Sequence, residues 1–96
     1  MNSQLRSIED ILIDRLKITQ EIAKANTEQL RLNQISGGLM FLDLKDERDG
    51  VENSEHSDEQ AKTDKALDEN LDRINRLEKQ LSELDEELEA RVEKDS

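Results

Sequence analysis

The sequence contains no cysteine, proline, tryptophan or tyrosine, and its single aromatic residue is Phe41. Without cysteine there is no disulfide framework and no thiolate metal site. Without aromatic side chains, which bury the largest areas, a chain of 96 residues lacks the means to build a stable compact core. The lack of proline removes the strongest helix breaker. These absences exclude a small globular fold and favour long, uninterrupted helices.

Hydrophobic residues make up only 32% of the chain, whereas charged residues make up 41%. This composition is typical of a coiled coil or of a disordered chain, and the absence of proline favours the coiled coil. A chain with so little apolar surface is only weakly stable alone. We therefore expect protein partners that bind through helices, in a homo-oligomer or a hetero-oligomer.

The net charge of −11 is unevenly distributed. Residues 1–42 are neutral, residues 43–60 carry −6 and residues 61–96 carry −5. Such an acidic chain repels phosphate backbones and anionic lipid heads, so direct binding to nucleic acid or to a membrane is not expected. No apolar run approaches the length of a membrane span, and the first residues do not resemble a secretion signal. We expect a cytoplasmic protein, and a nuclear location stays open.

An N-terminal amphipathic helix is predicted over residues 1–37. Ser7 with Asp10 approximates a capping box near its start, and Gly37-Gly38 are expected to end it. Its apolar residues form two adjacent seams. The first seam contains Ile8, Ile11, Ile18, Ile22, Ala25 and Leu32. The second seam contains Leu5, Leu12, Leu16, Ala23 and Leu30. Two seams imply neighbours on two sides, as in a bundle of three or four helices.

A C-terminal heptad helix is predicted over residues 58–96, with Ser57 and Gln60 as its capping box. Its seam is a clear coiled-coil pattern made of Leu67, Ile74, Leu77, Leu81, Leu84 and Leu88. Asn70 is the polar residue of this seam. A buried amide can set the register of a coiled coil, but Asn70 could equally lie at a frayed end, and both interpretations stay open.

Residues 38–57 are predicted to form an acidic, flexible connector. They begin with the most hydrophobic patch of the chain, which consists of Leu39, Met40, Phe41 and Leu42. This patch is the candidate partner-binding site, because apolar anchors dominate binding energy, although it could also fold back to cap the bundle. Two helices of nearly equal length joined by such a connector favour an antiparallel hairpin. The alternative is two helices that splay apart and pair with other chains.

Candidates for chemistry are few. The single histidine, His56, lies in the acidic connector, and no glycine-rich phosphate loop is present. Acidic residues surround Gly50, but an EF-hand register would place Lys45 and His56 at its two end positions, which fails. We expect no enzyme activity, no catalytic residues, no cofactor and no metal.

The segment from Asp49 to His56 reads Asp-Gly-Val-Glu-Asn-Ser-Glu-His. These eight residues resemble the coiled-coil tip of Gre-type transcript cleavage factors. In that family the hairpin enters the secondary channel of RNA polymerase, and two tip acids help to hold a magnesium ion. The resemblance implies that Asp49 and Glu52 would have those roles here.

The fold class expected from these patterns is all-α: two long amphipathic helices forming a hairpin or coiled coil within a multi-helix bundle. The expected function is that of a non-catalytic coiled-coil interaction protein, a small assembly subunit or adaptor that packs its helices into a larger complex. One alternative is a regulator of transcription or nucleic-acid machinery that acts through the acidic tip or by charge mimicry. A second alternative is a structural homo-oligomer without an external client.

Overall fold

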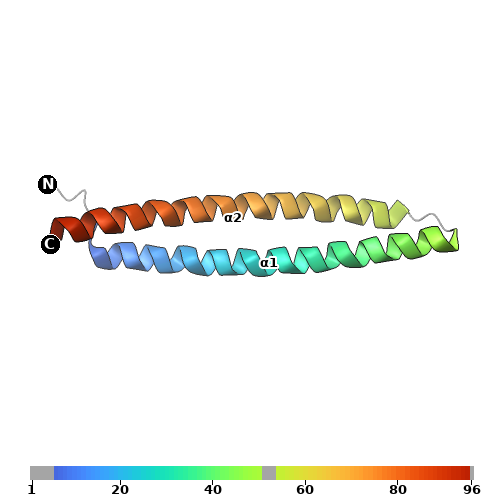
Figure 1. The fold of residues 1–96 in the computed structure, drawn as a ribbon, viewed down its shortest axis with the longest axis horizontal. Coiled ribbons are helices and arrows are strands. Elements are labelled where there is room, and N and C mark those ends of the chain that lie inside the picture. Colours follow the sequence, from blue (N-terminus) through green and yellow to red (C-terminus); the bar gives the residue numbers. More distant parts are fainter. Residues whose placement is uncertain (1–5, 51–53, 96) are drawn as a thin grey trace.

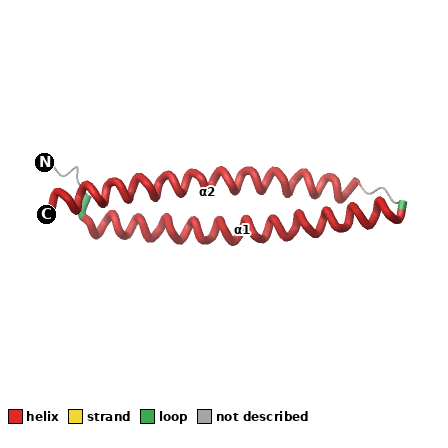
Figure 2. The backbone as a smooth tube through the Cα atoms, in the orientation of Figure 1, coloured by secondary structure: helices red, strands yellow, loops and turns green. Residues whose placement is uncertain are grey.

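The computed structural model describes residues 6–50 and 54–95. Two helices, α1 (Ile8–Asp49) and α2 (Ser54–Asp95), run antiparallel along each other, and the described part contains no strand. The hairpin measures 71 × 18 × 15 Å. The start of α1 and the end of α2 lie at the same end, and the turn that follows α1 lies at the other end (Figures 1 and 2). The predicted all-helical hairpin is confirmed over the alternative of two splayed helices.

The start of α1 follows the predicted capping chemistry. The Ser7 hydroxyl accepts a hydrogen bond of 3.1 Å from the backbone N–H of Asp10, and the Ser7 backbone is extended. Glu9 and Asp10 occupy the first turn, where carboxylates stabilise the positive end of the helix. The N-terminal boundary of the helix was therefore readable from local sequence.

The predicted end of α1 at Gly37-Gly38 is wrong. The helix continues through both glycines to Asp49. Gly50 instead forms the C-cap, in the left-handed conformation with φ 74° and ψ 22°. Two glycines inside a helix cost about 1 kcal/mol each. The cost is offset because the residues that follow are good helix formers and Leu39 returns to the seam that faces α2, where it is half-buried.

The predicted start of α2 is also too late. The helix begins at Ser54, so Ser57 lies inside it and does not cap it. Gln60 donates to the Ser36 hydroxyl of α1 at 2.9 Å, which is a contact between the helices rather than a capping bond. Most of the expected flexible connector is therefore helical, and of its residues only 51–53 lie outside the described part, while Gly50 forms the turn.

Both helices face each other with residues at alternating spacings of three and four. On α1 the predicted first seam is half-buried or buried throughout, with Ile11 fully buried. On α2 all six predicted heptad residues are likewise buried or half-buried, with Ile74 at 8% exposure. This alternation is the repeat of a left-handed coiled coil. It keeps the seam of each helix in contact with the other helix along the hairpin.

Asn70 lies within this interface, not at a frayed end. Its side chain is buried, and its amide nitrogen donates to the backbone carbonyl of Ala25 at 2.8 Å and to Gln29 Oε1 at 2.9 Å. A slip of either helix along the other would leave these buried polar groups without partners. Asn70 and Gln29 thus form a polar layer that favours one register.

Ion pairs across the interface reinforce this register. Arg6 forms a two-pronged contact with Glu87 at 2.7 and 2.9 Å, Arg15 contacts Asp85 at 2.6 Å, and Arg73 contacts Glu21 at 2.7 Å. All are partly exposed, and such pairs contribute roughly 0–1 kcal/mol each. Their main consequence is specificity, because each pairs opposite charges only in the observed antiparallel alignment.

Two isoleucines of α1 provide a test of the buried seam. Ile11 is 0% exposed and Ile35 is 38% exposed. We expect Ile11→Ala to lower the free energy of unfolding by about 2–4 kcal/mol, because it leaves a cavity in the interface. Ile35→Ala, the same change in the same helix, should cost less than about 1 kcal/mol. Urea unfolding followed by circular dichroism measures both, and equal losses would contradict the seam.

Candidate functional site

The second seam of α1 has no counterpart on α2. Leu12, Leu16 and Leu30 are 47%, 59% and 60% exposed, although they repeat with coiled-coil spacing. At 100° per residue this seam lies about 120° around the helix from the seam that α2 covers. One neighbouring helix covers only one of two such seams. The structure therefore leaves a complete helix-packing stripe on the surface.

This stripe belongs to a wider surface that carries no charge. Between residues 12 and 44, three of the seven heptad positions of α1 contain only uncharged residues, and every one is exposed. We call this surface the outer face of α1. It consists of Leu12, Ile13, Leu16, Thr19, Gln20, Ala23, Asn26, Thr27, Leu30, Asn33, Gln34, Gly37, Met40, Phe41 and Leu44. The face extends over residues 12–44 and is therefore about 48 Å long. So long an uncharged side is unusual in a chain in which 41% of the residues are charged.

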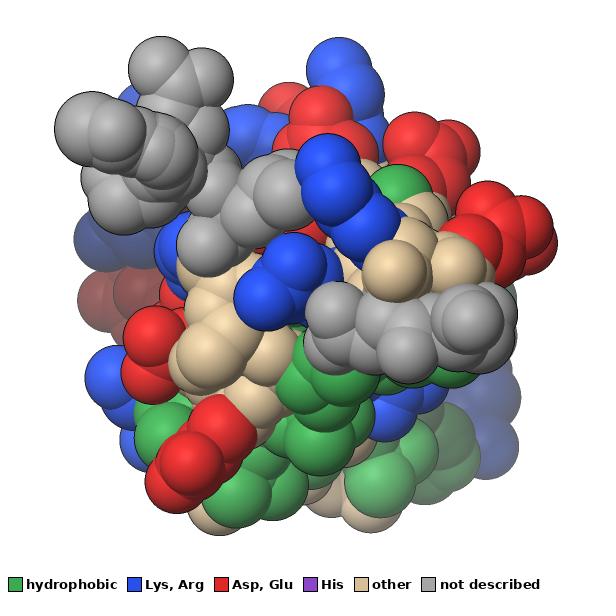
Figure 3. Space-filling model, turned by 90° about the vertical axis from the view of Figure 1, so that its left-hand side faces the viewer, with side chains coloured by type: hydrophobic (Ala, Val, Ile, Leu, Met, Phe, Trp, Pro, Cys, Tyr) green, Lys and Arg blue, Asp and Glu red, His purple; other side chains and the backbone are tan. Residues whose placement is uncertain are grey.

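The contrast with α2 is visible from the end of the molecule. Figure 3 looks along the hairpin from the end where α1 starts, and hydrophobic side chains gather along its lower side, where α1 runs. Charged side chains cover most of the upper part of this view, where α2 runs. Residues 54–95 contain fifteen acids against seven bases. The molecule is thus strongly two-sided, with an uncharged side on α1 and an acidic side on α2.

The predicted apolar patch does not form a single site. Because its four residues are consecutive on a helix, they point in four directions. Leu39 is half-buried on the side of α2, whereas Met40 and Phe41 lie on the outer face with exposures of 58% and 68%. Leu42 is 40% exposed and lies beside the covered seam. Only Met40 and Phe41 of the predicted patch therefore belong to the outer face of α1.

Sequence reasoning missed the part of the outer face beyond Gly37. Leu44 is 65% exposed and continues the second seam, but the two glycines were interpreted as the end of the helix. The signal was present as a repeat of one heptad that runs through Leu16, Ala23, Leu30, Gly37 and Leu44. Ile13, at 45% exposure, was also missed, because it lies beside the second seam and not on it.

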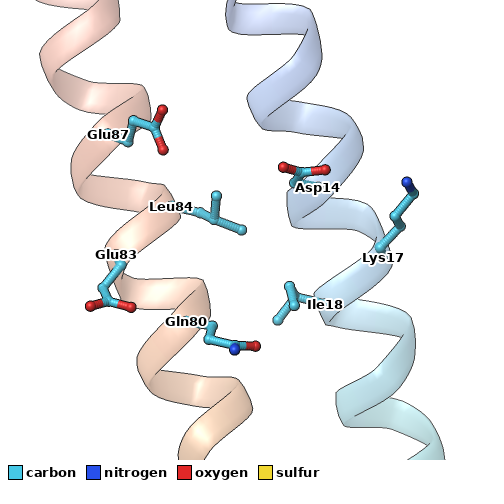
Figure 4. Close-up of a pocket in the computed structure, with 7 residues that line it drawn as sticks. All are labelled: Asp14, Lys17, Ile18, Gln80, Glu83, Leu84 and Glu87. Carbon is cyan, nitrogen blue, oxygen red and sulfur yellow. The ribbon is translucent and has the colours of Figure 1, made fainter. Parts of the chain in front are cut away.

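A groove of about 400 Å³ lies between the helices near their termini (Figure 4). Ile18 and Leu84 point toward each other across it, while Asp14, Glu87 and Glu83 stand around them. Arg6 hydrogen-bonds Glu87 and holds the pKa of that carboxyl below its ordinary value. Arg31 does the same to the pKa of Glu28. The apolar floor is the coiled-coil seam itself, and two carboxylates of the rim, Asp14 and Glu87, are paired with Arg6, so this is the ordinary crevice between packed helices.

The acidic tip brings few groups together. His56 Nδ1 lies 3.0 Å from Asp46 Oδ2 and 3.4 Å from Asp43 Oδ1 at the interface of the two helices. Asp49 is exposed at the end of α1, and Glu52 lies outside the described residues. Within residues 6–50 and 54–95, no group of three or more histidine, aspartate or glutamate side chains is arranged to hold a metal ion. Neither described helix has the length and apolar character needed to cross a bilayer.

Comparison with known proteins adds no further assignment. The chain matches no protein-family model, and neither a curated protein nor a solved structure is detectably similar to it. The role of the outer face of α1 must therefore be inferred from its own residues and their exposure.

The ion pair at the groove rim predicts a pH-dependent stability. Glu87 has a lowered pKa in the folded hairpin, so its contribution is present at neutral pH and is lost as the pH falls through that lowered value. Glu87→Gln should lower the melting temperature at pH 7, and the difference from wild type should shrink as the pH falls toward 2, because protonation of the carboxyl removes the ion pair.

The matched control is Glu86→Gln. Glu86 is exposed on the far side of α2 and has no ion pair within the described part of the chain. This substitution should leave the melting temperature unchanged or raise it slightly, because it removes one negative charge from an acidic helix. Thermal unfolding by circular dichroism at both pH values measures the effect, and an equal drop in the two variants would refute the role of the pair.

Proposed function

We propose that this protein is a non-catalytic helical assembly subunit that works by packing the outer face of α1 against further helices. The observation that carries the proposal is the exposed second seam, an uncharged, apolar stripe with the spacing that helices use to pack on helices. A solvated surface helix would carry charges on this side, as α2 does.

Support also comes from the thin core of the hairpin alone. Only four hydrophobic side chains among the described residues are buried, namely Ile11, Ala25, Leu32 and Ile74. Two helices that share so small a core are marginal in water. A further layer of helices on the outer face would cover the second seam of α1 as well as the first. The complex would then supply the stability that the single hairpin lacks.

The assembly role is tested by one charge on each side of the hairpin. Leu16 is 59% exposed on the outer face, and Leu71 is 48% exposed on α2, so both accept glutamate without filling a buried site. Leu16→Glu should abolish capture of helical partners from the native cell, because it places an unpaired carboxylate in the packed seam. Leu71→Glu should capture as wild type does.

Circular dichroism of both purified variants establishes that the hairpin is retained. Partner capture is read by mass spectrometry, with a second, differently tagged copy of the chain present in the same cells. If both variants still captured partners, or if both lost capture equally, the outer face would be ruled out as the partner-binding surface.

A second candidate function rests on the continuity of the helices. Because α1 runs unbroken through Gly37-Gly38, the turn falls at Gly50, and Asp49 stands at the far end of a hairpin 71 Å long. A long antiparallel hairpin with acids at its tip is the form expected from the resemblance to Gre-type transcript cleavage factors. In this alternative the protein would regulate a nucleic-acid enzyme by inserting its tip into a channel.

The tip is tested separately from the outer face. Asp49→Asn combined with Glu52→Gln should abolish stimulation of transcript cleavage by a purified RNA polymerase while helicity stays unchanged, since exposed charges contribute little to stability. The comparison is Glu47→Gln, which removes a nearby acid that the resemblance does not use. No stimulation by the wild-type protein would eliminate this candidate and leave the assembly role.

A further inference from the structure

We infer that the outer face of α1 binds the outer face of a second copy of this chain, antiparallel, so that two hairpins form a symmetric dimer with both α1 helices inside and both α2 helices outside. This inference rests on the proposed function, because it names the partner of the same docking surface. Its grounds are the charges, the apolar clusters and the exposed area of that surface.

The charges make α1 the only described side through which two copies can approach without repulsion. Residues 54–95 carry a net charge of −8, so contact between two α2 helices would set acid against acid. The outer face of α1 carries no charge over residues 12–44. A dimer joined through α1 keeps the two acidic helices on opposite sides and fully solvated. The overall charge of −11 is then compatible with self-association.

One ionic contact at each end of the outer face favours a second copy in the antiparallel orientation. Glu9 and Asp10 precede the face at its N-terminal end. Lys45 and Arg48 follow it at the other end, where they alternate with the acids Asp46, Glu47 and Asp49. Arg48 lies 3.8 Å from Asp49 and points toward no other described acid at that distance. Antiparallel pairing brings Glu9 of each copy to Arg48 of the other, whereas parallel pairing brings the acids Glu9 and Asp10 of both copies together.

The apolar side chains repeat the same symmetry. Leu12, Ile13 and Leu16 form one cluster, and Met40, Phe41 and Leu44 form another at the far end of the face. In the register that places Glu9 opposite Arg48 of the second copy, counting along both helices also places Leu16 opposite Phe41 and Ile13 opposite Leu44. The cluster around Leu16 in each copy then packs on the cluster around Phe41 in the other copy. The two-fold symmetry of the interface makes this contact occur at both ends.

The centre of the face is suited to close helix approach. It contains small and uncharged polar residues around Leu30, with Ala23 on one side and Gly37 on the other. A Cβ built on Gly37 would have no neighbour within 4 Å, so this position is open toward the outside. Asparagine, glutamine and threonine side chains between the clusters can hydrogen-bond their counterparts, because amides both donate and accept.

The exposed area matches what a dimer needs. Seven large apolar side chains on the face are between 45% and 68% exposed. At about 100 Å² each they offer roughly 700 Å² of apolar surface. Spread over the two end clusters and Leu30, this area approaches the roughly 800 Å² that each partner buries in a stable interface.

The experiment is sedimentation equilibrium of the purified full chain over a range of concentrations. We expect a monomer–dimer equilibrium. Leu16→Glu should raise the dimer dissociation constant at least about 30-fold, because each dimer contains two copies of this anchor and both meet Phe41 of the other chain. Leu71→Glu, at a half-exposed position on α2, should leave that constant within about threefold of wild type. A wild-type chain that stays monomeric at several hundred micromolar, or equal weakening by both variants, would overturn the inference.

Orientation is measured with a single spin label, which the absence of cysteine allows without further changes. Lys17→Cys places the label beside the outer face and not on it. In the antiparallel dimer the two labels are separated by about 35 Å along the axis, whereas in a parallel dimer they lie within about 20 Å. A short distance by pulsed electron resonance would overturn the antiparallel arrangement.

Charge reversal provides an independent measurement. Arg48→Glu should weaken the dimer, because it sets a carboxylate against Glu9 of the second copy at both ends. Adding Glu9→Lys to the same chain should restore the dimer, since opposite charges then meet again. Weakening that persists in the double variant would contradict the proposed register.

Failure of this inference is distinguishable from failure of the assembly role. A monomeric chain whose Leu16→Glu variant still loses its cellular partners would disprove the dimer and keep the docking surface. If Leu16→Glu affected neither the dimer nor the capture of cellular partners, both the proposed dimer interface and the assembly role of the outer face would be disproved. Capture of the differently tagged copy by wild type, but not by Leu16→Glu, would support both.

Discussion

The heptad spacing of α1 is the constraint on which the rest of this structure depends. Ile11, Ile18 and Leu32 recur on one side, and Leu16, Ala23 and Leu30 recur on another. A helix built in this way has two packing surfaces, but a two-helix hairpin supplies only one neighbour. The covered seam makes the hairpin, and the uncovered seam makes the molecule two-sided.

Polar contacts decide how the covered seam is aligned. Apolar side chains alone would tolerate a slip by one heptad, because leucines and isoleucines are similar in size. Asn70 hydrogen-bonds Ala25 and Gln29 inside the interface, and Arg73 pairs with Glu21 beside it. These groups find partners in one register only. The hairpin therefore combines modest apolar burial with specific polar alignment, as coiled coils with a buried asparagine do.

The difference in charge between α2 and the outer face of α1 suggests how each surface would be used. The acidic outside of α2 stays solvated and repels other acidic surfaces. The outer face of α1 has no charge to desolvate, so packing it against a helix avoids the cost of burying a charged group. An assembly subunit and a self-complementary dimer both follow from this one asymmetry. The acidic tip near Asp49 is separate in space and would serve a different partner, so the two candidate functions do not compete for the same residues.

Much of this arrangement was determined by the sequence alone. The absence of proline and aromatics, the cap at Ser7, the heptads of α2 and both seams of α1 predicted a helical hairpin, because helix periodicity and capping are local properties. The extent of α1 was not readable locally. Gly37-Gly38 carry a strong stop signal, but the helix continues to Asp49, because good helix formers follow and Leu39 returns, half-buried, to the seam that faces α2.

Tertiary structure likewise decided which of the two seams is covered. Each has the spacing of a packing surface, and the pattern of α1 by itself does not rank them. Pairing with α2 does, because Arg15, Glu21 and Gln29 flank or interrupt the first seam and meet Asp85, Arg73 and Asn70 across it. The second seam has no such polar partners on the described part of α2. Sequence therefore determined that α1 has two faces, and the contacts between the helices determined which one remains free to bind.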